Sequence, residues 1–364
     1  MRYSKVILCD NFIFELQTVG GVSRVWAKNI ERLDKIALDL YFLEGSGAKN
    51  NVFRRELTLT HPIISESSPT YVRRFLGSQI ESDIFHSSYY RISKKARFNV
   101  VTIHDFMNEL FPSNFRDPLL AYIKKRACNF ADRIIVVSER TKQDLLRHYP
   151  DINSGIVEVV YNGVDEEFFP EPFTAPFVIG EELIEPQGYF LYVGTRGYCK
   201  NFPYVLSFMA EARKQGLENR LVIVGSNSLS ADEYAYATSL GLSTNTFLHL
   251  YGINNISLRQ LYSNCTALLI PSIYEGFGLP ALEAARCGAL VLAARGSALD
   301  EIVGETEYSF DLNRKDEILR VLALGFDNTT ALTERARIQE RSNLFSWDNS
   351  VQRLAEIYNE FNKR

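Results

Sequence analysis

The segment 271–288 holds the residues whose types and spacing best suit chemistry. An apolar run is followed by a loop containing Glu275, Gly276, Phe277, Gly278 and Leu279, and a predicted helix beginning near Pro280 carries Glu283 in its first turn. Backbone N–H groups just ahead of a helix favour an anion, and glycines let a ligand approach closely. Because an anion repels carboxylates, we expect both glutamates to accept hydrogen bonds from sugar hydroxyls. An ordinary loop glutamate and a dipole-stabilising helix glutamate remain an equal alternative.

A second group of polar residues surrounds Lys200. Gly194 ends an apolar run, Arg196, Lys200 and Asn201 follow it, and Pro203 marks the start of a helix. Two cations at such a place could hold a nucleotide diphosphate and stabilise the charge left on it when a glycosidic bond breaks. For Arg196, a solvated surface arginine is the competing interpretation.

Two further candidates lie in the first half of the chain. His104 ends an apolar run and is followed by Asp105. An isolated histidine of this kind is more often structural, but the carboxyl ends of parallel strands are where ligands bind. Gly20 and Gly21, with Arg24 after them, form a glycine loop whose amides could lie against a phosphate or an acceptor.

These segments resemble the motifs of a known family. Glu275 and Glu283 form an E-x7-E pair, and the segment around them resembles the signature of the retaining family 4 glycosyltransferases with the GT-B fold. Five more segments resemble the family's motifs in the same order: Gly20-Gly-Val-Ser-Arg24, Val101-Thr-Ile-His-Asp105, Ala131-Asp-Arg-Ile-Ile-Val-Val-Ser138, Tyr161-Asn-Gly-Val-Asp165 and Tyr192-Val-Gly-Thr-Arg-Gly-Tyr-Cys-Lys-Asn201. The resemblance therefore extends over nearly the whole chain.

The resemblance implies a role for each matching residue. Lys200, assisted by Arg196, would hold the diphosphate, Glu275 the donor-sugar hydroxyls, Glu283 the ribose, and His104 the sugar near the reacting carbon. The residues expected to bind the donor are Gly20, Gly21, Gly194, Lys200, Asn201, Glu275, Gly276, Phe277, Gly278, Leu279 and Glu283. Asp105 and Arg24 are expected at the acceptor. The family also implies two domains with a cleft between them and a C-terminal helix that crosses back to the first domain.

The elements that must position these residues alternate along the chain. Expected strands are Lys5–Cys9, Leu38–Leu43, Asp83–His86, Asn99–His104, Arg133–Ser138, Ile156–Tyr161, Tyr189–Gly194, Arg220–Gly225, Thr246–Leu250, Ala267–Pro271 and Ala289–Ala293. Many are apolar on both faces, as in parallel sheets covered by helices on each side. The alternation predicts an α/β chain of two doubly wound, Rossmann-like domains.

Domain boundaries follow from length and proline content. A chain of 364 residues exceeds what one hydrophobic core usually serves. Four prolines between Pro170 and Pro186 predict an extended linker. We therefore expect an acceptor-binding domain over residues 1–168, a linker over 169–187, a nucleotide-sugar domain over 188–345 and a crossover helix over 346–364, with one apolar stripe along Trp347–Asn362.

Composition excludes several classes of protein. With 46% hydrophobic and 23% charged residues the chain is neither disordered nor fibrous. No apolar run reaches the roughly 18 residues of a spanning helix, and the start lacks the features of a signal peptide, so we expect a cytoplasmic protein. The five cysteines and five histidines show no metal-ligand spacing. We expect no metal and no cofactor.

Charge is distributed unevenly. Residues 1–150 hold 23 Lys and Arg against 16 Asp and Glu, whereas residues 151–180 hold six acidic residues and no Lys or Arg. The basic residues of the first half form three clusters: Arg73-Arg74, Lys94-Lys95-Arg97 and Lys124-Lys125-Arg126. For any single cluster, such as the one on the expected helix around Lys124, a solvated basic face of a packed helix is the favoured interpretation. The three clusters together predict peripheral contact with the anionic inner face of a cell membrane. The balance falls far short of that of a nucleic-acid-binding protein.

The leading hypothesis is retaining transfer of a hexosyl group from a nucleotide diphosphate sugar to a sugar acceptor. The motifs favour GDP-mannose and a lipid-linked saccharide of bacterial surface polysaccharide or O-antigen synthesis. Without an evident nucleophile or D-x-D motif, we expect a front-face, metal-independent reaction. Open alternatives are a UDP- or dTDP-sugar donor (glucose, GlcNAc or rhamnose), a GT-B sugar-nucleotide epimerase, and a non-catalytic sugar-nucleotide-binding protein. No G-x-G-x-x-G follows a strand and no P-loop occurs, which disfavours dehydrogenases and P-loop NTPases.

Overall fold

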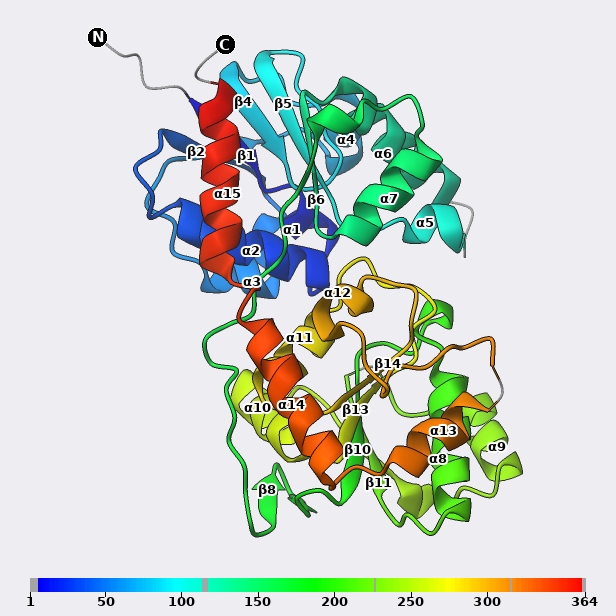
Figure 1. Ribbon diagram of the computed structural model, residues 1–364. Helices are drawn as coiled ribbons and strands as arrows, with labels where there is room; N and C mark the ends of the chain where they lie inside the picture. Colours follow the sequence, from blue (N-terminus) through cyan, green and yellow to red (C-terminus); the bar gives the residue numbers. More distant parts are fainter. Residues whose placement is uncertain (1–5, 113–116, 226, 315, 362–364) are drawn as a thin grey trace. The chain divides into compact units, whose positions relative to one another are not determined.

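A computed structural model describes residues 6–112, 117–225, 227–314 and 316–361 (Figure 1). The chain divides into two compact units. Unit 1 contains the chain as far as Gly163 and again from Phe345 onward, and unit 2 is Val164–Leu344. The division lies slightly ahead of the boundary expected after residue 168.

Unit 1 is built on one parallel sheet of seven strands in the order β3-β2-β1-β4-β5-β6-β7. The strands are β1 (Ile7–Asp10), β2 (Leu40–Gly45), β3 (Ile63–Glu66), β4 (Ser82–Ser87), β5 (Ala96–Ile103), β6 (Arg133–Val136) and β7 (Val157–Val159). Lys5, expected in the first strand, lies outside the described residues. Strand β3 was not expected, because an edge strand with half its side chains exposed forms no continuous apolar run.

The helices of unit 1 connect these strands, except the C-terminal one, which follows unit 2 in the chain. They are α1 (Ile13–Leu16), α2 (Gly21–Leu33), α3 (Val52–Glu56), α4 (Thr70–Leu76), α5 (Met107–Leu110), α6 (Asp117–Phe130), α7 (Glu139–His148) and α15 (Trp347–Glu360). The last of them, α15, packs against α2 with a buried stripe that includes Val351, Leu354 and Ile357. Tyr358 adds a 2.5 Å hydrogen bond to Nδ1 of His86. The expected return of the C-terminal helix to the first domain is confirmed.

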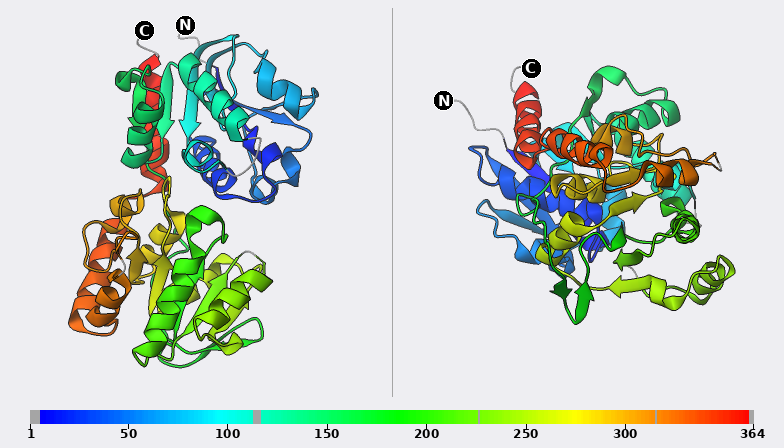
Figure 2. Two further views of the ribbon diagram at one scale, coloured as in Figure 1. Left: turned by 90° about the vertical axis from the view of Figure 1, so that its right-hand side faces the viewer. Right: turned by 60° about the horizontal axis from the view of Figure 1, so that its bottom comes forward.

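Unit 2 holds a parallel sheet of five strands in the order β12-β11-β10-β13-β14. Its strands are β10 (Tyr189–Val193), β11 (Arg220–Val224), β12 (Phe247–Leu250), β13 (Ala267–Ile270) and β14 (Val291–Ala293). Its helices are α8 (Phe202–Lys214), α9 (Ala231–Ser239), α10 (Asn255–Asn264), α11 (Leu279–Arg286), α12 (Leu299–Val303), α13 (Glu317–Leu324) and α14 (Thr329–Ser342). Helices α8, α9 and α13 pack together, as do α10, α11, α12 and α14, with the sheet between the two groups (Figures 1 and 2).

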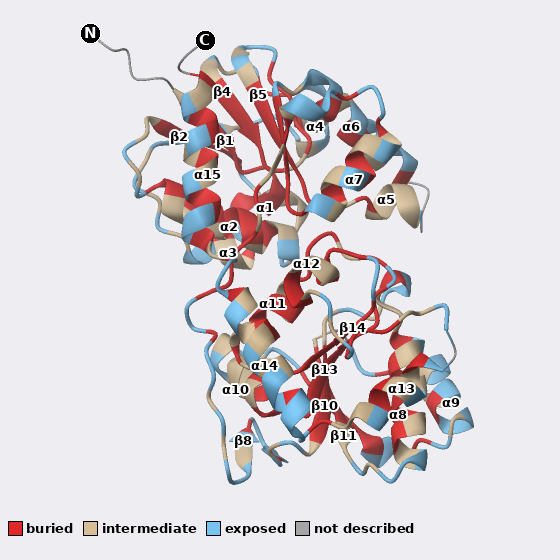
Figure 3. Cartoon of the chain, in the orientation of Figure 1, coloured by how far each residue is buried: buried red, intermediate tan, exposed pale blue. Residues whose placement is uncertain are grey.

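The central strands of both sheets are among the most buried parts of the chain (Figure 3). In β13, all four residues are buried, and in β5 the last five are. Strands that are apolar on both faces require helical cover on both faces, so the expected pair of doubly wound α/β units is confirmed. Among the described residues, none of the helices has both the length and the hydropathy needed to cross a membrane.

The proline-rich segment is part of unit 2, not a separate linker. The Glu171 amide donates to Ser263 Oγ (3.0 Å), and the Phe173 amide donates to Asn264 Oδ1 (2.6 Å). After these contacts the chain forms a short hairpin of β8 (Phe177–Ile179) and β9 (Glu182–Ile184). Proline excludes helix here, but it does not prevent a two-stranded hairpin between the prolines.

Candidate functional site

The topology of unit 2 places two loops side by side. Strands β10 and β13 are neighbours, and the strand order reverses between them. In open α/β sheets ligands bind at the carboxyl end of such a switch point. The loop after β10 and the loop after β13 meet there, because the amide of Ile273 donates a 2.7 Å hydrogen bond to the carbonyl of Cys199.

Lys200 and Glu275 form an ion pair at this switch point. The Nζ atom of Lys200 lies 2.7 Å from Oε1 of Glu275, and the hydroxyl of Ser272 donates to the same oxygen at 2.7 Å. The Lys200 side chain is 30% exposed and that of Glu275 is 13% exposed. A cation and a carboxylate that are both within reach of solvent suit a ligand with phosphates beside hydroxyls.

The loop that carries Glu275 turns sharply into α11. Gly278 precedes the helix with φ 108° and ψ 53°, and a Cβ added to it would lie 2.6 Å from Cδ2 of Leu299. Glycine is therefore required here both by the backbone conformation and by the close approach of α12. The amides expected to face an anion, those of Phe277, Gly278 and Leu279, lie at this turn.

We expect Gly278→Ala to destabilise the protein by about 1–3 kcal/mol, since alanine is strained at positive φ and its methyl group would displace Leu299. Thermal unfolding measures the change. Gly21→Ala is the matched control, because nothing lies within 4 Å of a Cβ added at Gly21. Equal unfolding temperatures for the two variants would contradict this description of the loop.

Glu283 is less accessible than expected. Because α11 begins at Leu279, Glu283 lies in its second turn and not in the first. The residue is 3% exposed and accepts a 3.1 Å hydrogen bond from the hydroxyl of Tyr262 on α10. Its contact with a ribose stays a prediction.

Arg196 is held by protein groups and not by solvent. Its Nε lies 2.7 Å from Oε1 of Glu233, and its two terminal nitrogens donate to the carbonyls of Asn227 and Ser228 at 2.8 Å each. Although burial opposes it, hydrogen bonding from Arg196 and Ser230 holds the pKa of Glu233 below its ordinary value. With its side chain 8% exposed, Arg196 is not a solvated arginine, and its contact with a diphosphate stays a prediction. We assign it to bracing the loop after β10.

The backbone around Lys200 has two special conformations. Gly194, at the end of β10, has φ 132°, which a side chain rarely allows. Asn201 has φ 52° and ψ 47°, the left-handed conformation that asparagine tolerates best after glycine, and it precedes α8 directly. Both residues therefore shape the loop that carries Lys200, and their contact with a donor stays a prediction.

In unit 1, His104 follows the buried end of β5. It is 7% exposed, and its Nε2 atom is buried without a hydrogen-bond partner. Burial and then the nearby Lys124 lower the pKa of His104 to about 4, opposed by a hydrogen bond involving the backbone of Ser88. The imidazole is therefore neutral at physiological pH. An unused buried ring nitrogen is costly unless a ligand engages it.

Near His104 lies Lys124, whose burial was not expected from the sequence. It was expected on a solvated basic face, but it is 1% exposed. Its Nζ lies 2.7 Å from Oε2 of Glu109 and donates to the carbonyl of Asp105 at 2.8 Å. The Asp105 carboxylate accepts from the amide of Met107 at 3.1 Å. These bonds orient the turn after His104, and an acceptor contact by Asp105 stays a prediction.

The glycine loop of unit 1 is partly closed by its own side chains. Helix α2 begins at Gly21, and Oε1 of Gln17 accepts a 3.1 Å hydrogen bond from the amide of Ser23. A Cβ on Gly20 would collide with the Gln17 side chain, whereas the space beside Gly21 is open. Arg24 lies on the next turn of α2 and is partly buried.

The predicted site residues therefore fall into two groups, one in each unit. Gly20, Gly21, Arg24, His104 and Asp105 belong to unit 1, and the others belong to unit 2. Within unit 2 the structure joins Lys200 to Glu275 directly.

The residues that sequence analysis missed are partners of predicted ones. Ser272 holds Glu275, Tyr262 holds Glu283 and Glu233 holds Arg196. Of these, only Ser272 carried a signal, since it lies three residues before Glu275 in the motif.

Curated relatives were found among bacterial enzymes. The chain is 24% identical over 283 residues to O-antigen chain mannosyltransferase B of Escherichia coli, which covers 76% of this chain and 74% of the relative. It is 30% identical over 217 residues to D-rhamnosyltransferase WbpZ of Pseudomonas aeruginosa (57% and 52%). It is 27% identical over 261 residues to the serotype-specific mannosyltransferase WbdA of Escherichia coli, covering 65% of this chain but only 30% of WbdA.

Solved structures share the fold over nearly the full chain. Sucrose-phosphate synthase from Thermosynechococcus elongatus superposes with a TM-score of 0.73 at 19% identity, covering 99% of each chain. Anabaena HepE in complex with UDP-glucose superposes with a TM-score of 0.70 at 16% identity, covering 98% of this chain and 100% of that one. At these identities the likeness shows the fold alone.

Two family models match consecutive parts of the chain. "Glycosyltransferase Family 4" matches residues 19–168, and "Glycosyl transferases group 1" matches residues 179–343. The first includes His104 and the glycine loop, and the second includes Lys200, Glu275 and Glu283. Together with the two doubly wound units and the shared fold, these matches show that the chain belongs to the family 4 glycosyltransferases with the GT-B fold.

Proposed function

We propose that the chain transfers a hexosyl group, with retention of anomeric configuration, from a nucleotide diphosphate sugar to a saccharide acceptor. The observation that carries the proposal is the Lys200–Glu275 pair at the switch point of unit 2. It sets a cation for phosphates and a carboxylate for hydroxyls within 2.7 Å of each other, next to the turn into α11. A sugar linked to a diphosphate presents the same two chemistries in adjacent positions.

The chemistry follows from these charges. When the bond between the anomeric carbon and the diphosphate oxygen breaks, the Lys200 ammonium and the amides at the start of α11 stabilise the negative charge on the leaving oxygen. The acceptor hydroxyl forms its bond to the anomeric carbon on the face that the diphosphate leaves, and its proton passes to a leaving-phosphate oxygen. Because Lys200 supplies positive charge, we propose that the reaction needs neither metal nor cofactor.

We propose GDP-mannose as the donor and a lipid-linked saccharide of bacterial surface polysaccharide or O-antigen synthesis as the acceptor, in the cytoplasm. Support comes from the relatives named as O-antigen mannosyltransferases. A UDP-sugar is the second candidate, because the structure of HepE contains UDP-glucose. A rhamnose donor is a third candidate, because one relative is named as D-rhamnosyltransferase WbpZ.

A thermal-shift panel of nucleotide sugars tests the donor. We expect GDP-mannose at a hundredfold excess over its Kd to add about 2.7 kcal/mol of stability, and UDP-glucose and dTDP-rhamnose at the same concentration to add much less. Incubation with the stabilising donor and acceptor glycans should give a glycosylated acceptor. An epimer formed from the donor alone would instead identify an epimerase, and a larger shift with UDP-glucose would refute GDP-mannose.

We also propose peripheral contact of unit 1 with an anionic membrane, through a surface on α4 and α6 that includes only part of the basic clusters. Arg73 is 5% exposed and bonded to Glu15, and Lys124 is buried, so neither can reach lipid. Large exposed apolar residues instead gather on α4 and α6: Tyr71, Phe75, Leu76, Leu119, Tyr122 and Phe130. Arg126 joins the two helices by donating to the carbonyl of Phe75 at 2.8 Å. Aromatic residues beside Arg126 and Lys125 suit a lipid interface.

The double variant Tyr122→Ser/Phe130→Ser should lose at least half of its sedimentation with anionic vesicles at low salt, since these side chains are 61% and 41% exposed and would insert at the interface. The control is Leu332→Ser, a 60% exposed residue of unit 2. Equal sedimentation of the wild-type protein with anionic and zwitterionic vesicles would refute the proposed membrane contact.

A further inference from the structure

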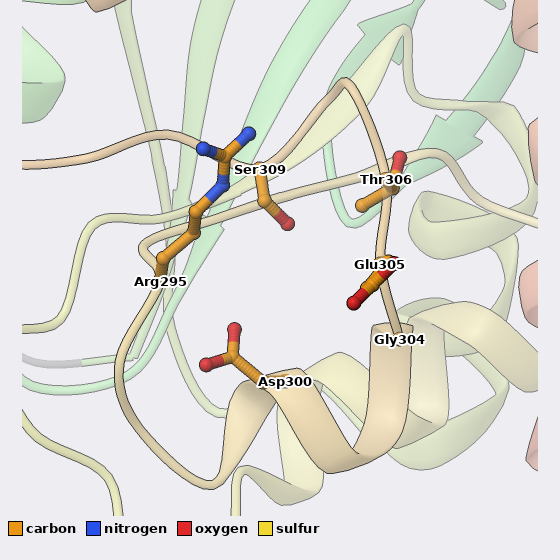
Figure 4. Close-up of a pocket in the computed structure, with 6 residues that line it drawn as sticks. All are labelled: Arg295, Asp300, Gly304, Glu305, Thr306 and Ser309. Atoms are coloured by element: carbon orange, nitrogen blue, oxygen red, sulfur yellow. The ribbon is translucent and has the colours of Figure 1, made fainter.

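A polar pocket of about 510 Å³ lies beyond the end of β14, beside α12 (Figure 4). Its lining residues come from the loop after β14, from α12 and from the loop that follows: Arg295, Asp300, Gly304, Glu305, Thr306 and Ser309. The volume falls in the range of small-molecule sites. None of these residues takes part in the site around Lys200.

The pocket contains groups with unused hydrogen-bonding capacity. Ser309 is 2% exposed, and its buried hydroxyl has no partner. In Figure 4 this hydroxyl and the carboxylates of Asp300 and Glu305 point toward the middle of the pocket, with Arg295 across from Glu305. Asp300 is held in place because its Oδ2 accepts a 2.8 Å hydrogen bond from the amide of Gly296.

The lining chemistry narrows the class of ligand. One guanidinium against two carboxylates disfavours a phosphate, and the lack of an aromatic or large apolar side chain disfavours a nucleobase or an acyl chain. Among the described residues, no group of three or more His, Cys, Asp or Glu side chains could hold a metal ion. Carboxylates that accept and a guanidinium that donates match a neutral molecule with several hydroxyls.

The pocket is also connected to the loop that carries Glu275. The amide of Ala298, one residue before α12, donates to the carbonyl of Glu275 at 3.4 Å, and Leu299 closes over Gly278. We propose that this pocket is a saccharide subsite that binds one unit of the acceptor glycan. The inference rests on the proposed function, and it assigns acceptor recognition to unit 2 as well.

Binding of neutral disaccharides tests the subsite directly. The probes are α-mannobiose, maltose, lactose and chitobiose, titrated against the full chain by calorimetry. For whichever disaccharide binds wild type most tightly, we expect Arg295→Ala and Glu305→Gln each to raise Kd about tenfold, the scale for losing one charge-assisted hydrogen bond. Glu307→Gln, an exposed neighbour outside the lining, should leave Kd unchanged.

Ser309→Ala separates binding from stability. Because the hydroxyl has no partner in the free protein, its removal should leave the unfolding temperature unchanged or raise it, while it weakens disaccharide binding. If no disaccharide binds wild type, or if the variants bind as wild type does, the subsite is refuted. If the variants weaken disaccharide binding but no nucleotide sugar is bound or consumed, the subsite stands and the proposed function fails.

Discussion

Lys200→Ala and Glu275→Ala are each expected to lower kcat by at least about a hundredfold, the scale for removing one preorganised charge from a transition state. Lys200 lies at the switch point of unit 2, with its Nζ atom 2.7 Å from Oε1 of Glu275. Without it, the charge developing on the diphosphate loses its neutralising partner. Without Glu275, the sugar loses an ionised acceptor for its hydroxyls. Initial rates at saturating donor and acceptor measure both losses.

The ion pair also predicts how the two losses combine. In Lys200→Ala the carboxylate of Glu275 is left uncompensated and repels the phosphates, so part of that loss disappears when Glu275 is removed too. We expect the double variant to be much less impaired than the product of the single losses. Lys214→Ala, a 64% exposed lysine on α8 of the same unit, is the control and should turn over normally. Wild-type turnover in either single variant would refute the site.

The parts of the site that sequence predicted are those set by local pattern. The runs before Lys200 and Glu275 are apolar on both faces, which only a central parallel strand buries, and they became β10 and β13. Glycine followed by Leu279 and Pro280 marked the start of α11, and the helix begins at Leu279. Given two neighbouring central strands, the meeting of their loops follows from the topology of any doubly wound sheet.

The parts that sequence missed depend on partners far along the chain. Arg196 looked available because Glu233, which holds it, is 37 residues away on α9. Lys124 looked solvated because its neighbours Lys125 and Arg126 are charged, yet Glu109 and the Asp105 carbonyl neutralise and bury it. A helix periodicity reports which face is apolar on average, and it cannot report a single charged residue that finds a buried partner.

His104→Asn is expected to lower kcat about a hundredfold at neutral pH, if the unpartnered Nε2 atom engages the donor sugar as the family resemblance implies. Because the pKa of His104 is lowered to about 4, wild-type kcat should show no inflection from this residue between pH 6 and 8, and should fall as the imidazole is protonated below about pH 5. His61→Asn, a histidine of unit 1 that pairs with Asp34, is the control for kcat.

Stability gives a second readout of the same group. A histidine whose pKa is 6.5 in the unfolded chain and about 4 in the folded protein binds fewer protons when folded, so its contribution is present above pH 6.5 and is lost as the pH falls toward 4. His86, whose pKa burial lowers to about 3, acts in the same direction in wild type and variant. The drop in unfolding temperature from pH 7 to pH 5 should therefore be smaller in His104→Asn than in wild type. An equal drop in both would mean that His104 is not buried as a neutral imidazole, and its assignment to the sugar would lose its physical basis.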